Sequence, residues 1–274
     1  TQLIGSGITT VLDAVALGDY RDGNRQENLD QFINTVAESQ KRGLTRAEHR
    51  IHLRCEVPHS TTVGLFERYV NMPEVQLVSL MDHAPGQRQF VNIDKYRTYY
   101  QGKYNMTDAE MAVYEKDQVA QSQRWSKQNR DEITRQCRDL NIPTASHDDA
   151  TSAHVTESKE LGMVIAEFPT TVEAAKRSHE LGLKVMMGAP NVIRGGSHSG
   201  NVAAYELASL GVLDILSSDY YPVSLLDAVF TLVNDERNNL DVAQAVQLAT
   251  LNPAQALSLT ERGVIAEVKR ADLA

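Results

Sequence analysis

The fold is decided by residues 142–219, which read IPTASHDDATSAHVTESKELGMVIAEFPTTVEAAKRSHELGLKVMMGAPNVIRGGSHSGNVAAYELASLGVLDILSSD. Short apolar runs alternate here with stretches that have the amphipathic spacing of helices. These stretches close on Leu-Gly pairs at 161–162, 181–182 and 210–211, and glycine readily adopts the left-handed conformation that ends a helix. The pattern predicts a βα repeat and a parallel sheet wound in one direction. The predicted strands are Ile142–His147, Met163–Phe168, Lys184–Ala189 and Leu213–Asp219.

Three earlier runs also look like strands, namely Ile8–Val15, Ile51–Val57 and Val75–Asp82. We therefore expect an α/β fold of the (β/α)8 TIM-barrel type over residues 1–258, truncated because its first strand would lie upstream of Thr1. Residues 259–274 are expected to begin a small β-domain, most of which is missing. A doubly wound open sheet is the alternative, but such a sheet ordinarily has a glycine-rich turn after its first strand, and residues 11–14 contain no glycine.

Residues 84–140 are a polar, tyrosine-rich stretch between two predicted strands, and we expect them to form a helical insert. The sequence from Thr107 to Glu110 has the form of a capping box, which predicts that a helix begins there. A long insert after a barrel strand lies on the active-site face, where a lid would be. The alternative is a helical segment that only packs or dimerises, which leaves a homo-oligomer open.

Composition argues against several kinds of partner. The formal net charge is −9, and no cluster of Lys and Arg is interleaved with aromatic residues, so we expect no nucleic-acid partner. No apolar run approaches the roughly 18–20 residues of a membrane span, so we expect no membrane partner. Neither Cys55 nor Cys137 belongs to a CxxC pair, and the sequence contains no basic-then-apolar leader segment, so we expect a reducing, cytoplasmic location.

Carboxylates and imidazoles stand at the ends of the predicted strands. In a parallel barrel the catalytic groups lie at the carboxyl ends of the strands, so these side chains are expected to share one mouth. Such a set suits Zn²⁺ or a similar divalent ion. A single residue of this kind is often only a helix cap, and Asp148 and Asp149 are expected to be caps. His52 and Arg54 lie deeper and could form only a buried polar layer. The strand-end residues are Glu56, Asp82, His83, His147, Glu167 and Asp219.

A glycine-rich loop, residues 191–201, follows the strand Lys184–Ala189. Barrels commonly bind phosphate in their last loops through backbone N–H groups, here those of Gly195 and Gly196. Arg194 and His198 would add side chains that bind an anion, and Arg88 could supply a second cation at the rim. The alternative for the loop is a flexible connection that binds nothing. The alternative for Arg88 is a side chain that is merely solvated.

Several of these stretches together resemble the amidohydrolase superfamily and, within it, the diphosphatases of the carbon–phosphorus lyase pathway of phosphonate metabolism. The runs QRQF at 87–90 and GGSHSGN at 195–201 carry the narrower resemblance, whereas SSD at 217–219 and TLNPA at 250–254 mark the superfamily broadly. The other matching stretches are LRCEV at 53–57, SHDD at 146–149 and AEFPTT at 166–171.

The resemblance implies a metal-dependent hydrolase that cleaves the triphosphate of a ribose 1-alkylphosphonate 5-triphosphate and releases diphosphate. Our hypothesis is that Asp219 takes a proton from a water that attacks phosphorus, with His83 as a second catalytic residue. The resemblance also implies a His-x-His or His-x-Asp motif on the first strand. Because the chain lacks that motif, we expect one or two metal ligands to be missing. The expected ligands are Glu56, His147, Glu167 and Asp219, and the expected phosphate-binding residues are Arg88, Arg194, Gly195, Gly196 and His198.

Two other functions are compatible with these residues. The same metal scaffold could hydrolyse a cyclic amide or deaminate a small molecule. The chain could also be a noncatalytic binding subunit, in which case it would take up no divalent metal.

Overall fold

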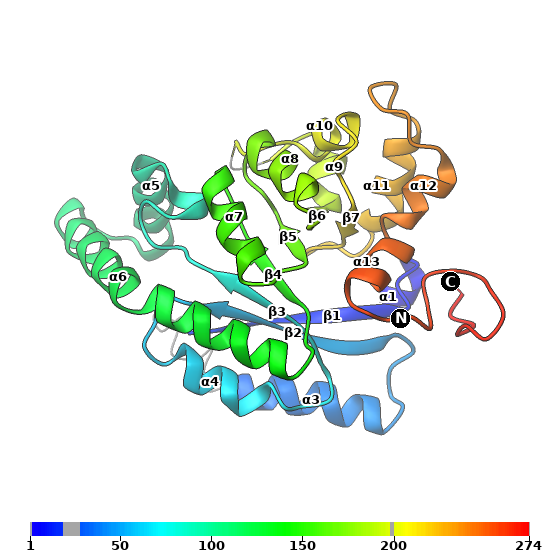
Figure 1. Ribbon diagram of the computed structural model, residues 1–274, viewed down its shortest axis with the longest axis horizontal. Coiled ribbons are helices and arrows are strands. Elements are labelled where there is room, and N and C mark those ends of the chain that lie inside the picture. The colour runs from blue at the N-terminus through cyan, green and yellow to red at the C-terminus, as the bar shows by residue number, and fades with distance from the viewer. Residues whose placement is uncertain (1, 19–27, 198–199, 274) are drawn as a thin grey trace.

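The computed structural model describes residues 2–18, 28–197 and 200–273, which form a seven-stranded parallel sheet in the order β1 to β7 (Figure 1). All seven predicted strands are present. Their sequential order is that of a barrel wound in one direction, whereas a doubly wound sheet would reverse its order part-way. No pairing joins β7 to β1 among the described residues, so the ring is open. The strands are β1 (Thr10–Leu17), β2 (Glu48–Glu56), β3 (Val75–Met81), β4 (Thr144–His147), β5 (Ile165–Glu167), β6 (Lys184–Gly188) and β7 (Ile215–Ser217).

Alternation along β2 separates the outer face of the sheet from the interior. Ile51, Leu53 and Cys55 are fully buried in one apolar cluster beneath the helices that cover the outer face, while His52 and Arg54 point inward. The covering helices of β1 to β4 are α3 (Leu29–Lys41), α4 (Thr62–Tyr69) and the second half of α6 (Asp108–Asp139). Because each side chain fully buried in this layer contributes about 1.5–3 kcal/mol, the register that keeps the polar residues inward is strongly favoured.

The Leu-Gly closures predicted for the βα repeat are confirmed. Gly162, Gly182 and Gly211 have φ angles of 86°, 78° and 68°, each directly after the residue that caps a helix. Together with α1 (Gln2–Gly5), the helices of the remaining chain are α7 (Ser152–Glu160), α8 (Val172–Glu180), α9 (Ala189–Arg194), α10 (Ala204–Ser209), α11 (Ser224–Val233), α12 (Val242–Gln247) and α13 (Leu251–Ala256).

The insert between β3 and β4 is helical and projects at one end of the molecule (left in Figure 1). It consists of η1 (Arg88–Phe90), α5 (Ile93–Tyr104) and α6. The predicted capping box is confirmed at the start of α6. The Thr107 side chain accepts from the backbone N–H of Glu110, and the Glu110 side chain accepts from the backbone N–H of Thr107. Ile133 and Cys137 near the end of α6 belong to the apolar cluster under the sheet. The same helix therefore supplies both the insert and the crossover to β4.

An apolar layer fills the interior near the amino ends of the strands. Leu77, Ile165 and Ile215 from three strands pack there against Leu257 and Leu259, which follow α13. The carbonyl oxygen of Leu257 accepts a 3.0 Å hydrogen bond from Gln76 Nε2. The carboxyl ends of the strands carry polar side chains instead, among them Arg54, His147 and Glu167.

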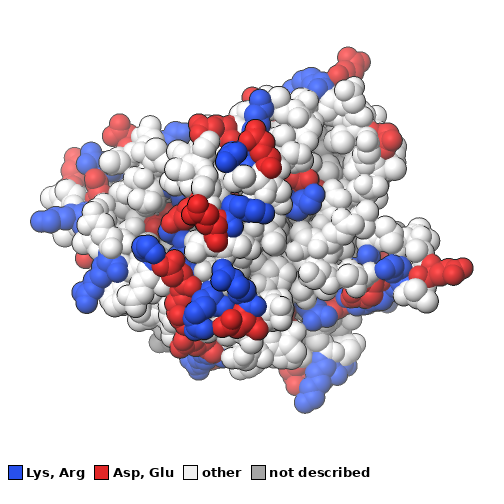
Figure 2. Space-filling view, in the orientation of Figure 1, with Lys and Arg blue, Asp and Glu red and all other residues white. Residues whose placement is uncertain are grey.

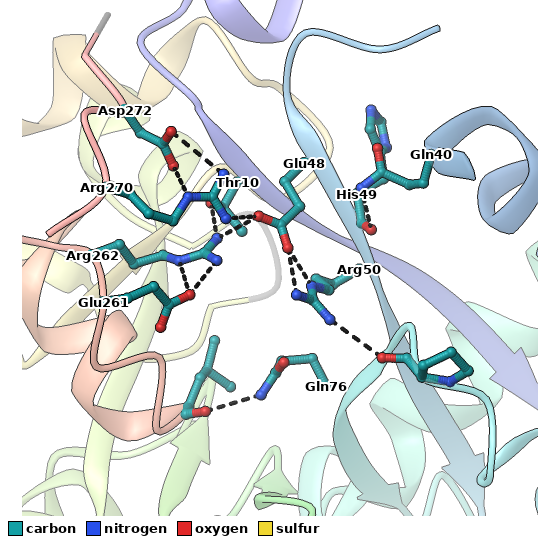
Figure 3. A network of polar contacts seen from close by, with 12 residues as sticks. Thr10, Gln40, Glu48, His49, Arg50, Gln76, Glu261, Arg262, Arg270 and Asp272 are labelled. Carbon is teal, nitrogen blue, oxygen red and sulfur yellow. Dashed lines mark hydrogen bonds and ion pairs between the residues drawn. The ribbon is translucent and has the colours of Figure 1, made fainter. Parts of the chain in front are cut away.

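Glu48, at the start of β2, connects the sheet to the segment that follows α13 (Figure 3). Its carboxylate contacts Arg50 Nη2 at 2.5 Å and Arg262 Nη1 at 3.0 Å, and it also accepts a hydrogen bond from Arg270. Burial alone would raise the pKa of Glu48, but these arginines outweigh it and lower that pKa to about 2. Residues 259–273 form turns and extended chain, and the small β-domain stays a prediction.

The surface in Figure 2 carries Lys and Arg interspersed with Asp and Glu. No basic groove stands out on that face, and the expected absence of a nucleic-acid partner stays a prediction. Within the described ranges, no helix has the length and apolar character needed to cross a membrane.

Candidate active site

Glu56 and His83 form an ion pair at the carboxyl ends of β2 and β3. Glu56 Oε1 lies 2.5 Å from His83 Nδ1. Burial alone would raise the pKa of Glu56, but the charge of His83 and its hydrogen bond outweigh burial and lower that pKa to about 2. Burial alone would lower the pKa of His83, but Glu56 and Asp148 raise it to about 10.

His147 and Glu167 form a second carboxylate–imidazole pair, because the parallel register of β4 and β5 places them side by side. His147 Nδ1 lies 2.8 Å from Glu167 Oε2, and His147 Nε2 lies 3.0 Å from Arg54 Nη2. A guanidinium can only donate, so Nε2 must accept and Nδ1 must carry the proton that is donated to Glu167. Burial alone would raise the pKa of Glu167, but His52 and His147 lower it to about 2.

His52 belongs to a deeper polar layer, as the sequence suggested. Its Nε2 contacts Ser79 Oγ at 2.8 Å, and its Nδ1 lies 3.9 Å from Glu167 Oε1. Burial lowers the pKa of His52 to about 4, so the ring is neutral at pH 7. Arg54, two residues further along β2 on the same face, instead lines the cavity described below.

Asp148 brings the two pairs together. Its Oδ2 lies 3.5 Å from His83 Nε2 and 3.4 Å from His147 Nε2. One ligand atom from each of the three residues lies within 4.8 Å of the other two, and two imidazole nitrogens with a carboxylate oxygen suit a zinc-like divalent ion. The donor set therefore fits a metal centre.

The sequence-based assignment of Asp148 as a helix cap is wrong. The N-cap of α7 is Thr151, whose side chain accepts a hydrogen bond from the backbone N–H of His154. Asp148 instead has a φ of 57°, a left-handed conformation that costs about 1–2 kcal/mol for a residue with a side chain. Thr151 is a good N-cap residue directly before α7, and its presence in the sequence could have shown that Asp148 is not needed as the cap. Asp149 is not a cap either, because its carboxylate pairs with Arg88.

Asp219 follows β7 and faces the same cavity as His147 and Asp148, which has a volume of about 300 Å³. Gly188 makes room for it, since a Cβ atom built on that glycine would lie 3.1 Å from Asp219 Oδ2. Glu56 does not line this cavity and reaches it only through His83.

Arg194, the last residue of α9, lines the same cavity as His83 and Asp148. Its Nη2 donates a 2.6 Å hydrogen bond to the hydroxyl of Tyr220, a residue that sequence reasoning left out of the site. Gly195 caps α9 in the left-handed conformation. The N–H groups of Gly195 and Gly196 were expected to bind phosphate, but they donate to the carbonyl oxygens of Val192 and Asn191 at the end of this helix, so that expectation is wrong. His198 lies outside the described residues.

Arg88 does not stand at the rim, where the sequence led us to expect it. Its side chain is 3% exposed and pairs with Asp149 and, at 3.0 Å, with Glu157 Oε2. Glu157 also contacts Arg130 of α6 at 2.9 Å. The folding of the insert against α7 thus places Arg88 in a buried charge cluster away from the cavity.

The sequence pattern of the amidohydrolase family matches residues 1–274. The chain belongs to the amidohydrolase family. It is 64% identical over 272 residues to alpha-D-ribose 1-methylphosphonate 5-triphosphate diphosphatase of Escherichia coli (strain K12), a match that covers 99% of this chain and 72% of the relative. A crystal structure of a D-hydantoinase aligns over 98% of this chain and 68% of its own, with a TM-score of 0.48 and 11% identity. Membership of the family implies a divalent metal.

Proposed function

We propose that this amidohydrolase hydrolyses alpha-D-ribose 1-methylphosphonate 5-triphosphate and releases diphosphate. The observation that carries the proposal is the convergence of His147, Asp148, Asp219 and Arg194 on one cavity of about 300 Å³. Such a cavity joins a candidate metal centre to a cation that can bind phosphate. The 64% identity to a relative named for this activity supports the choice of substrate.

His83, His147 and Asp148 would hold the metal ion, and their donor atoms favour zinc. A divalent ion bound there would polarise a phosphoryl oxygen and lower the pKa of a water. Of the ligands expected from the sequence, Glu56 and Glu167 each contact the Nδ1 atom of a histidine, which is how carboxylates orient metal-binding imidazoles. We therefore assign these two glutamates a positioning role.

Asp219 is the proposed base. It accepts a proton from the attacking water as the oxygen of that water bonds to phosphorus, and the bond to the departing diphosphate breaks. Arg194 would bind the negative charge of the phosphates. This local anion site suits a protein whose net charge is −9. For Arg88 we propose that it positions the insert and does not bind substrate.

The proposal is tested by measuring diphosphate release from the ribosyl triphosphate with added Zn²⁺. We expect Asp219→Asn to lower kcat by about 10²–10⁴-fold, because a positioned base contributes an amount of this order. Asp227→Asn, which changes an exposed aspartate on α11, is the matched control and should leave kcat unchanged. Unaltered turnover in Asp219→Asn would show that Asp219 is not the base. If the unaltered protein binds Zn²⁺ and still releases no diphosphate, the proposed function is refuted.

We further propose that the reaction takes place in the cytoplasm. Cys55 and Cys137 are both buried free thiols, which is compatible with a reducing compartment.

A further inference from the structure

A second cavity, of about 260 Å³, is also lined by His83, one of the residues of the candidate metal centre. His83 lines both cavities, so the two adjoin at this residue. One part of the wall comes from Glu56 and the residues that follow β2. The rest comes from the insert, where α5 contributes Tyr100 and Tyr104 and α6 contributes Tyr114.

The lining of this cavity suits a neutral ligand rich in hydroxyl groups. Among the described residues that line it there is no Lys or Arg, whereas Glu56 and Asp117 supply two carboxylates. With only the imidazolium of His83 to offset them, these carboxylates disfavour the highly charged triphosphate chain in this cavity. Gln118 and Gln121 can both donate and accept hydrogen bonds, and the tyrosine rings offer apolar faces with a polar edge.

The walls of the cavity are held in place by their own contacts. The ring of Tyr100 packs against the rings of Tyr104 and Tyr114, with centroids 5.8 Å and 5.6 Å apart. Lys103 is not in the wall, and its Nζ lies over the ring of Tyr104, 5.1 Å from the centroid. Asn129 Nδ2 on α6 donates to the carbonyl oxygen of Val57 at 2.8 Å, which ties this helix to the chain leaving β2. Because these walls are already ordered, a ligand that binds here pays little free energy for ordering them.

We propose that this second cavity binds the sugar ring of the substrate, with the phosphate chain extending past His83 into the first cavity. The inference rests on the proposed function and names the part of the site that recognises ribose. Its volume of about 260 Å³ lies just below the range of about 300–1,000 Å³ for whole small-molecule sites, as expected for a pocket that holds one part of a ligand. In the first cavity Arg54 and Arg194 offset the carboxylates of Asp148 and Asp219, whereas no Lys or Arg lines the second, which favours the first cavity for the phosphates.

Binding of D-ribose 5-phosphate, measured by calorimetry, tests the sugar site without any need for catalysis. We expect the unaltered protein to bind it, and Gln118→Leu to weaken binding about tenfold, the loss that follows when a hydrogen bond to a buried hydroxyl is removed. Gln123→Leu makes the same chemical change at an exposed position of α6 and should bind like the unaltered protein. Methyl phosphate, which has no sugar, should bind more weakly than ribose 5-phosphate.

The turnover of two triphosphates gives the second readout. The ratio of kcat/KM for the ribosyl triphosphate to that for methyl triphosphate should fall about tenfold in Gln118→Leu and stay constant in Gln123→Leu. A purely structural effect of Gln118→Leu would lower both values together and would overturn the sugar site.

The two proposals fail in different ways. If diphosphate is released but ribose 5-phosphate does not bind, or binds equally well to Gln118→Leu, the sugar site is refuted and the proposed function stands. If Gln118→Leu weakens binding of ribose 5-phosphate but no triphosphate is hydrolysed, the sugar site stands and the proposed function is refuted.

Discussion

Arg54 Nη2 lies 3.0 Å from His147 Nε2, and this contact determines the tautomer of His147. Because the guanidinium only donates, Nε2 carries the lone pair and Nδ1–H donates to Glu167 at 2.8 Å. A metal ion bound at the cavity would use this lone pair of Nε2 in place of the hydrogen bond from Arg54. The carboxylate of Glu167 accepts the Nδ1 proton and so stabilises the tautomer in which Nε2 is unprotonated.

Glu167→Gln should weaken zinc binding about 10–100-fold without abolishing it, since an orienting carboxylate contributes an affinity of this order. His147→Ala should weaken it further, because the nitrogen ligand itself is removed. Competition with a chromophoric chelator measures both affinities. Glu160→Gln, at an exposed position of α7, is the control and should bind zinc normally. Equal affinities of Glu167→Gln and the unaltered protein would show that Glu167 does not orient His147.

Arg194→Ala should raise the KM for the triphosphate about 10–100-fold, because a charge-assisted hydrogen bond to phosphate contributes about 1.5–3 kcal/mol. The zinc content, measured by elemental analysis, should not change. Arg177→Ala, which removes an arginine from the surface of α8, should leave KM unaffected. If Arg194→Ala keeps its KM, the first cavity does not bind the phosphate chain through this residue, and hydrolysis of a cyclic amide becomes the better hypothesis.

Gly188→Ala should lower kcat by as much as about 10²-fold, because the new Cβ would lie 3.1 Å from Asp219 Oδ2 and would displace that carboxylate. Gly64→Ala is the matched change on α4, where a Cβ meets nothing within 4 Å, and it should be neutral or stabilising by up to about 1 kcal/mol. Steady-state kinetics together with thermal unfolding separate the two effects. Normal turnover in Gly188→Ala would show that the position of Asp219 is not critical.

Glu48→Gln should lower the free energy of unfolding at pH 7 by about 1–2 kcal/mol. This is less than the shift in the pKa of Glu48 alone would give, because water partly screens the charges of Glu48 and its arginines. The pKa of Glu48 is lowered from 4.5 to about 2, so its contribution is present above pH 4.5 and is lost as the pH falls toward 2. The difference between the unaltered protein and Glu48→Gln should therefore shrink between pH 4.5 and pH 2.

Urea unfolding at pH 7, 4 and 3 measures this difference. Glu38→Gln removes an exposed carboxylate of α3 and should show no such pH dependence. A stability difference for Glu48→Gln that stays constant over this range would mean that Glu48 does not anchor the segment after α13 through its charge.

The parallel winding could be predicted because its signals are local. Leu-Gly closures and apolar runs of strand length depend only on neighbours along the chain, and all seven predicted strands appear in the predicted order. The carboxyl ends of parallel strands meet at one edge, so the rule for strand ends also placed His147 and Asp219 in one cavity.

The partners of each side chain at the site could not be predicted in the same way. Glu167 meets the Nδ1 atom of His147 because of the register between β4 and β5, which no local pattern encodes. Arg88 is buried because the insert folds back on α7. Asp148 turns toward two imidazoles because Thr151 caps the helix in its place.

The sequence by itself determined the order and direction of the strands and the chemical types of the residues at their ends, because hydrophobic periodicity and helix closure act over a few neighbouring residues. Only the tertiary structure decided which carboxylate orients which histidine, which arginine faces the cavity, and that a second cavity adjoins the first at His83. Those outcomes depend on contacts between segments far apart in the chain, where burial and charge pairing at distances of a few ångströms select one partner among several of the same type.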